Sequence, residues 1–169
     1  MRDGDGSLAP AAPDVSNPGV SFLPASTNGD YEGAPLAAHL LTLLGLLSIG
    51  PGLIHLFLPD GGAGVIAGLD LACNRAVVVG TFAWAGATQL AWGIALVVAS
   101  LRYRSLVPLL LALVILERTL IALNLWVLKA PPTAHRPPEA YGVLVGIPLV
   151  AFALFLSLRR RAPLAAKPT

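Results

Sequence analysis

The sequence predicts an all-α membrane protein, a bundle of four transmembrane helices that follows a disordered N-terminal tail. Of the 169 residues, 56% are hydrophobic and 12% are charged, and the mean hydropathy is +0.75. These values are typical of a chain whose main partner is the lipid bilayer. Four apolar stretches are close to the roughly 20 residues that cross a bilayer as a helix. They cover residues 36–58, 77–99, 106–128 and 141–158, within a transmembrane domain of residues 36–160.

Residues 1–35 are predicted to form the disordered tail. They hold five Pro, five Gly and five acidic residues, and few large apolar ones. A segment of this composition cannot bury enough apolar surface to offset the entropy of ordering its backbone. Residues 161–169 are expected to form a second short tail.

The first span, residues 36–58, contains two features that affect packing. Pro51 should bend the helix and leave the carbonyl of Leu47 without its usual amide partner. Ser48 and Gly52 form a small-xxx-small pair, which allows a neighbouring helix to come close.

The loop at residues 59–75 has too few apolar residues to cross a bilayer, and we expect it to form a short interfacial helix that covers the bundle. The second span, 77–99, is rich in Gly and Ala, a composition that suits a central, tightly packed helix. The link at residues 101–105 is short, so the second and third spans are expected to be antiparallel neighbours.

The third span, 106–128, carries Glu117 and Arg118 side by side at its centre. On insertion scales each central charge costs about 2.5–3.5 kcal/mol, which the Leu, Ile and Val residues of the span roughly offset. Charges inside membranes normally face protein or water, so this helix should be an inner wall. The fourth span opens with Gly142 and Gly146, a motif that mediates contacts within one bundle or, alternatively, a dimer interface.

The orientation follows from the Lys and Arg residues outside the spans. Seven lie on the side of the two tails and the 101–105 link, and three lie on the other side, so both termini are expected in the cytoplasm. The seven are Arg2, Arg102, Arg104, Arg159, Arg160, Arg161 and Lys167, and the three are Arg75, Lys129 and Arg136. The arginines thus indicate topology and not nucleic-acid binding.

The polar residues of the spans suggest a pocket inside the bundle that opens to the outer side. Glu117 and Asn124 lie two turns apart and share a helix face. Gln89 lies at a similar depth, and His55 lies near the opening. Arg118 is expected to donate to the Leu47 carbonyl or to an acidic partner. The residues assigned to the pocket mouth are Asp60, Asp70 and Arg75.

A structural interpretation of the same residues stays open. Glu117 and Arg118 would then be a polar clamp that fixes the register of the helices, and His55 a helix-end residue hydrogen-bonded near the headgroups. His39 and His55 are sixteen residues apart, about 24 Å along a helix, and cannot share a metal ion. We expect neither a metal nor a cofactor. The sequence contains no P-loop, H-E-x-x-H or G-x-S-x-G motif, so no catalytic residue is assigned.

The segment GPGLIHLFLPD, Gly50 to Asp60, combines a Gly-rich helix end, a histidine and a Pro-Asp exit before a loop and three further spans. Residues 36–160 resemble the small four-helix inner-membrane proteins of bacteria grouped as DoxX-like or as uncharacterised conserved membrane proteins. They do so in the number and length of the spans and in the Gly and Pro residues that interrupt or end them. The resemblance implies a four-helix fold in a bacterial cytoplasmic membrane. It assigns no role to any residue.

Two classes of function follow from these features. In the first, the protein is a non-enzymatic accessory or assembly component that binds another membrane protein, or a second copy of itself, through Gly-rich helix faces. In the second, the polar pocket around Glu117 binds a small lipophilic molecule, such as a quinone, a sterol-like compound or an isoprenoid, and carries or isomerises it.

Overall fold

The computed structural model describes residues 22–130 and 136–159, and it confirms the prediction of four long helices. Each of the four spans is long and apolar enough to cross a membrane. The described part of the chain contains no β-strand. The long helices are α1 (Pro35–Phe57), α2 (Arg75–Arg102), α3 (Val107–Leu123) and α4 (Pro138–Leu158); the short ones are the 3₁₀-helices η1 (Asn28–Asp30) and η2 (Arg104–Leu106) and the π-helix η3 (Asn124–Leu128), which continues α3.

Proline sets the start of three long helices, because Pro35, Pro108 and Pro138 each occupy the first turn of α1, α3 or α4. A proline has no N–H to satisfy, and its fixed φ suits the first turn. Helix α4 therefore begins three residues before the predicted span. Helix α2 follows Asn74, which has a left-handed conformation, and continues to Arg102, beyond the predicted end at residue 99.

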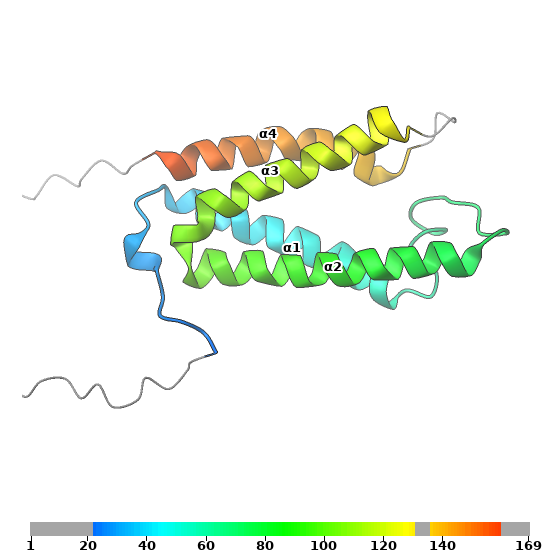
Figure 1. The fold of residues 1–169 in the computed structure, drawn as a ribbon, viewed down its shortest axis with the longest axis horizontal. Coiled ribbons are helices and arrows are strands. Elements are labelled where there is room, and N and C mark those ends of the chain that lie inside the picture. Colours follow the sequence, from blue (N-terminus) through cyan, green and yellow to red (C-terminus); the bar gives the residue numbers. More distant parts are fainter. Residues whose placement is uncertain (1–21, 131–135, 160–169) are drawn as a thin grey trace, which may run out of the picture.

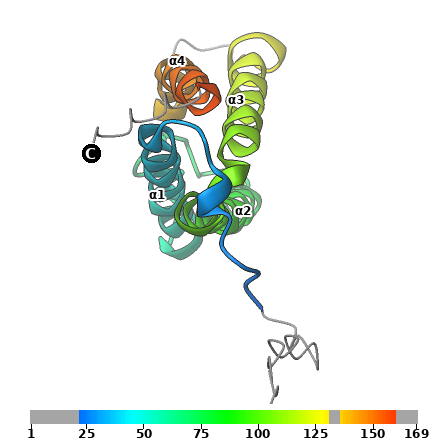
Figure 2. The ribbon, with the colours of Figure 1, turned by 90° about the vertical axis from the view of Figure 1, so that its left-hand side faces the viewer.

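The helices alternate in direction and pack as two pairs, α1 with α2 and α3 with α4 (Figures 1 and 2). The two pairs touch mainly through α1 and α4. Helices α2 and α3 run antiparallel, as predicted from their short link, but they make little contact. The packing face of α2 is occupied by α1, and α3 packs on α4 instead.

Glycine brings the backbones of α1 and α2 together. A Cβ atom added to Gly86 would lie 2.8 Å from the Gly52 carbonyl oxygen, and one added to Gly93 would lie 2.7 Å from the Gly45 carbonyl oxygen. Ser48 is buried on the same stripe of α1. The close approach of these two helices therefore requires residues without a side chain.

The buried core lies at one end of the bundle, where α1 and α3 begin and α2 and α4 end. All four long helices contribute to it. Its members are Ala37, Ala38, Leu41, Leu96, Val107, Leu111, Val114, Val150 and Ala153. Of the polar residues of the predicted pocket, Glu117 and Gln89 lie near the middle of their spans, and His55 and Asn124 lie toward the other end.

Residues 22–34 cross this same end of the bundle and are held there by hydrogen bonds, so the prediction of disorder is wrong for this segment. The Thr27 amide donates to the Arg102 carbonyl at 3.1 Å, and the Asn28 side-chain amide donates to the Leu101 carbonyl at 2.7 Å. The last carbonyls of a helix have no partner within it, and here the segment supplies one. The predicted tails at residues 1–21 and 161–169 lie outside the described residues.

Candidate functional site

The α1–α2 loop is organised by the carboxylate of Asp60. One carboxylate oxygen accepts the amide of Gly62 at 2.9 Å, and the other accepts the amides of Gly64 at 3.0 Å and Val65 at 2.8 Å. These bonds, chiefly those from Val65 and Gly62, hold the pKa of Asp60 below its ordinary value, since they favour the charged form. Because the amides turn around one carboxylate, the loop forms successive turns. The expected short interfacial helix is not formed.

His55 fastens this loop to the two helices beneath it. Its Nδ1 lies 2.6 Å from the Gly61 carbonyl oxygen, and because a carbonyl only accepts, Nδ1 carries the hydrogen. The imidazole packs edge-on against Phe82 of α2, with ring centroids 5.1 Å apart. Gly61 has a φ of +64°, and a Cβ there would lie 2.9 Å from the Phe82 Cβ. This geometry is that of a hydrogen-bonded helix-end histidine.

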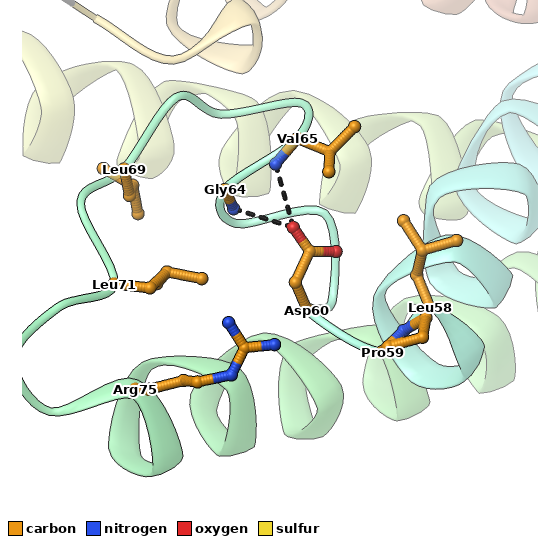
Figure 3. A pocket seen from close by; sticks show the side chains of 8 residues that line it. All are labelled: Leu58, Pro59, Asp60, Gly64, Val65, Leu69, Leu71 and Arg75. Atoms are coloured by element: carbon orange, nitrogen blue, oxygen red, sulfur yellow. Dashed lines mark hydrogen bonds between the residues drawn. The ribbon is translucent and has the colours of Figure 1, made fainter.

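A cavity of about 740 Å³ lies between the loop and the start of α2 (Figure 3). It is lined by Leu58, Pro59, Asp60, Gly64, Val65, Leu69, Leu71 and Arg75. Arg75 extends from α2 into this cavity, on the side facing Asp60 (Figure 3). Of the three residues predicted at a pocket mouth, Asp60 and Arg75 line this cavity. Asp70 does not line it, and its carboxylate accepts the amide of Ala72 at 2.9 Å.

Glu117 and Arg118 lie on the other helix pair, where Arg118 connects two carboxylates. Its Nη1 lies 3.6 Å from Glu139 Oε1 at the start of α4, and its Nε lies 3.9 Å from Glu117 Oε2. Of the two partners expected for Arg118, the structure thus provides an acidic one. The exposed fractions of the Arg118 and Glu117 side chains are 26% and 36%, so the helices shelter this doublet only in part.

Aromatic side chains fasten the end of the third span to the start of α4. The Trp126 indole N–H donates to the Ala140 carbonyl at 3.0 Å, and its ring meets Tyr141 edge-on at 5.9 Å. The guanidinium carbon of Arg136 lies 4.4 Å from the centre of the Trp126 ring, a cation–π contact. Glu139, directly after Pro138, is an acidic residue in the first turn of α4, which is a typical signal for the start of a helix.

The structure does not gather the predicted pocket residues around Glu117. In residues 22–130 and 136–159, no hydrogen bond or ion pair joins His55, Gln89 or Asn124 to Glu117. Asn124 is exposed and begins the π-helix, where its carbonyl accepts the Lys129 amide. Glu117 Oε2 and Gln89 Oε1 are each buried without a hydrogen-bond partner in this part of the chain.

A groove of about 600 Å³, which was not predicted from the sequence, runs along the outer face of α2. It is lined by Trp84, Ala87, Thr88, Ala91, Trp92 and Ala95. Successive helical residues are rotated by about 100°, so Ala91 and Ala95 lie on the side of α2 opposite Gly86. The signal for this groove was a second run of small residues four positions apart, framed by two tryptophans.

Like the alanines of the α2 groove, the glycines of the α4 motif are not covered by another helix of the described chain. Apart from the backbone of α4 itself, no heavy atom of the described chain lies within 4 Å of a Cβ added to Gly142 or Gly146. Gly142 is exposed. Close packing against another helix of the same chain therefore does not account for this motif, and the alternative of a contact with a second molecule stays a prediction.

The described residues bring no three His, Cys, Asp or Glu side chains together in a way that could hold a metal ion. Comparisons with protein-family models, curated proteins and solved structures find no match to this chain. The assignment of function therefore rests on the geometry of the exposed faces and polar groups.

Proposed function

We propose that this protein is a non-enzymatic accessory or assembly component of a membrane, and that it binds a transmembrane helix of another protein along the outer face of α2. The groove on α2 is the observation that carries the proposal. Trp84, at one end of the groove, is 74% exposed. Three alanines spaced four residues apart, Ala87, Ala91 and Ala95, line the groove with small side chains. Helices associate in lipid through close packing of small residues, and the opposite face of α2 already pairs with α1 in this way.

The proposed setting is a bacterial cytoplasmic membrane with both termini in the cytoplasm. The ends of the described chain, near residues 22 and 159, lie at the same end of the bundle as the α2–α3 link (Figure 1). That end carries Arg102, Arg104 and Arg159, and an excess of Lys and Arg marks the cytoplasmic side. The bacterial assignment rests on the sequence resemblance alone.

The test is to fill the groove and measure what copurifies. In nanodiscs, Ala91→Phe should reduce copurification of a partner by about tenfold or more, because overpacking a contact costs about 1–3 kcal/mol and 1.4 kcal/mol is a factor of ten. Ala112→Phe on the exposed surface of α3 is the matched control and should have no effect. Coexpression of two differently tagged copies separates a foreign partner from self-association. Equal recovery of all partners by the Ala91→Phe variant and the wild type would rule the proposal out.

A second candidate function is the binding of a small lipophilic molecule beside Glu117. It is favoured by the two buried acceptor oxygens, on Glu117 and Gln89, that lack a donor in the described residues. A buried acceptor without a donor is costly, so a hydroxyl-bearing ligand such as a quinol or a sterol would gain by supplying one. Native mass spectrometry of Glu117→Gln, Glu117→Ala and Arg118→Ala tests this function. Loss of a bound small molecule with the fold intact supports it, and retention in all three variants contradicts it.

A further inference from the structure

We infer that the cavity beneath the α1–α2 loop is a binding site for an acidic phospholipid, with the lipid phosphate at Arg75 and part of an acyl chain against the apolar lining. This site is separate from the α2 groove and does not depend on it. The inference rests on the apolar lining of the cavity, on the guanidinium of Arg75, which has no bonded partner among the described residues, and on the position of the cavity at the end of two spans.

The size and lining of the cavity fit part of a lipid. Its volume of about 740 Å³ lies within the roughly 300–1,000 Å³ of ligand pockets. Five of its eight lining residues are apolar, namely Leu58, Pro59, Val65, Leu69 and Leu71. Val65 is 83% exposed and Leu69 41% exposed, so the loop presents apolar side chains outward next to the cavity. Such a lining favours a hydrocarbon segment over a fully polar solute.

Arg75 is the charged residue of this lining whose side chain has no hydrogen-bonded partner among the described residues. The Asp60 carboxylate stays charged, but its two oxygens already accept three backbone amides, and no ion pair joins it to Arg75 among the described residues. The Arg75 guanidinium makes no hydrogen bond or ion pair with the described residues, although it points into the cavity (Figure 3). An arginine fork matches the oxygens of a phosphate group, and this site therefore selects for an anion.

The position of Arg75 in α2 strengthens this argument. Arg75 is the first residue of the helix, where the unpaired amides and the helix dipole attract negative charge and disfavour a cation. Asn74, which precedes it, makes no side-chain capping bond. The arginine thus does not stabilise its own helix, whereas an anion held there would interact with both the guanidinium and the free amides. The loop joins the ends of two spans, at the level where lipid headgroups lie.

The experiment compares lipid retention by purified variants of the full chain. Protein from nanodiscs that contain equal parts of phosphatidylglycerol and phosphatidylcholine is released into mild detergent, and the lipids bound per protein are counted by native mass spectrometry. The wild type should retain phosphatidylglycerol in preference to phosphatidylcholine. Arg75→Ala should lower this retention at least about fivefold, whereas Arg75→Lys, which keeps the charge but not the fork, should lower it less. Leu69→Trp, which fills the apolar part, should also lower it.

Lys129→Ala is the matched control, because Lys129 is an exposed cation at the same end of the bundle but outside the cavity. If this variant loses as much phosphatidylglycerol as Arg75→Ala, the lipid is held by general surface charge and the inference is wrong. It is equally wrong if Arg75→Ala keeps wild-type retention, or if inorganic phosphate alone displaces the lipid, because the acyl chain would then contribute nothing. Intact retention in Ala91→Phe keeps this result separate from the α2 groove.

Discussion

The two helix pairs of this protein are held together by different means. In the α1–α2 pair, backbone meets backbone, and Gly45, Gly52, Gly86 and Gly93 allow it. In the α3–α4 pair, side chains provide the attachment: Arg118 reaches Glu139, and the Trp126 indole donates to the Ala140 carbonyl.

The difference illustrates how helices associate in an apolar solvent. Lipid tails are as apolar as leucine, so no hydrophobic force presses two spans together, and close van der Waals packing or polar attachment must do so. One pair of this chain depends chiefly on the first means, and the other adds the second. The α1–α2 pair should therefore be sensitive to added volume, and the α3–α4 pair to loss of a polar partner.

Adding a side chain to the α1–α2 contact should have the largest effect. In Gly86→Leu the new Cβ would lie 2.8 Å from the Gly52 carbonyl oxygen and 2.9 Å from the Leu56 amide nitrogen. Both atoms belong to the backbone and cannot rotate away, so the helices must separate. We expect the free energy of unfolding to fall by about 3 kcal/mol, the upper end of the usual cost of overpacking. Unfolding of the purified protein in bicelles measures this change.

Gly80→Leu is the control on the same helix. Apart from the backbone of α2 itself, no heavy atom of the described residues lies within 4 Å of a Cβ added at Gly80. The substitution should be neutral or slightly stabilising, since leucine is a better helix former than glycine by up to about 1 kcal/mol. If both substitutions lowered the free energy of unfolding by similar amounts, α2 would be destabilised by a larger side chain at any position. The backbone contact with α1 would then not explain the effect of Gly86→Leu.

The sequence was sufficient to predict the four spans, because membrane length and apolar composition are local properties. It also drew attention to Gly52, which lies in the α1–α2 contact. It did not distinguish Gly52 from Gly142, which is exposed, because small residues four apart look the same whether a neighbouring helix covers them or not.

Contacts between distant residues were the part that the sequence did not reveal. The bond from the Asn28 side chain to the Leu101 carbonyl joins residues 73 positions apart, so residues 22–34 were expected to be disordered from composition alone. The Asp60 turn was missed for a different reason: the apolar residues after it suggested a helix, although an Asp followed by glycines is typical of a turn. No hydrogen bond or ion pair of the described residues joins His55 to Glu117, because the two residues belong to different helix pairs.

Weakening the turn that Asp60 organises in the α1–α2 loop should destabilise the protein less than Gly86→Leu, but more than loss of the ion pair between α3 and α4. The amide bonds hold the pKa of Asp60 below its ordinary value of 3.8. A carboxyl group with a lowered folded-state pKa stabilises the fold above its unfolded pKa, and this contribution is lost as the pH falls from 3.8 through the folded value. Asp60→Asn should therefore lower the unfolding temperature at pH 7 and make it less sensitive to acid as the pH falls below 3.8.

Asp70→Asn provides the comparison within the same loop, because Asp70 is exposed and accepts only the Ala72 amide among the described bonds. It should leave the unfolding temperature and its pH profile nearly unchanged. The organising role of Asp60 would be refuted if the two substitutions had the same effect. The change at Asp60 should also stay below that of Gly86→Leu, since it loosens a loop and leaves the helix contact in place.

Removing the ion pair between Arg118 of α3 and Glu139 of α4 should lower the stability of the protein least. Arg118 and Glu139 approach to 3.6 Å, but 26% and 44% of their side chains are exposed, so neither charge is fully desolvated. A double-mutant cycle of Arg118→Ala and Glu139→Ala should give a coupling free energy of about 0.5–1 kcal/mol. Arg118→Ala alone should cost more than Glu139→Ala alone, because it also removes the cation beside Glu117 at 3.9 Å. A coupling near zero would leave Trp126 as the attachment of this pair, while one above about 3 kcal/mol would mark a buried ion pair and a fully sheltered Arg118.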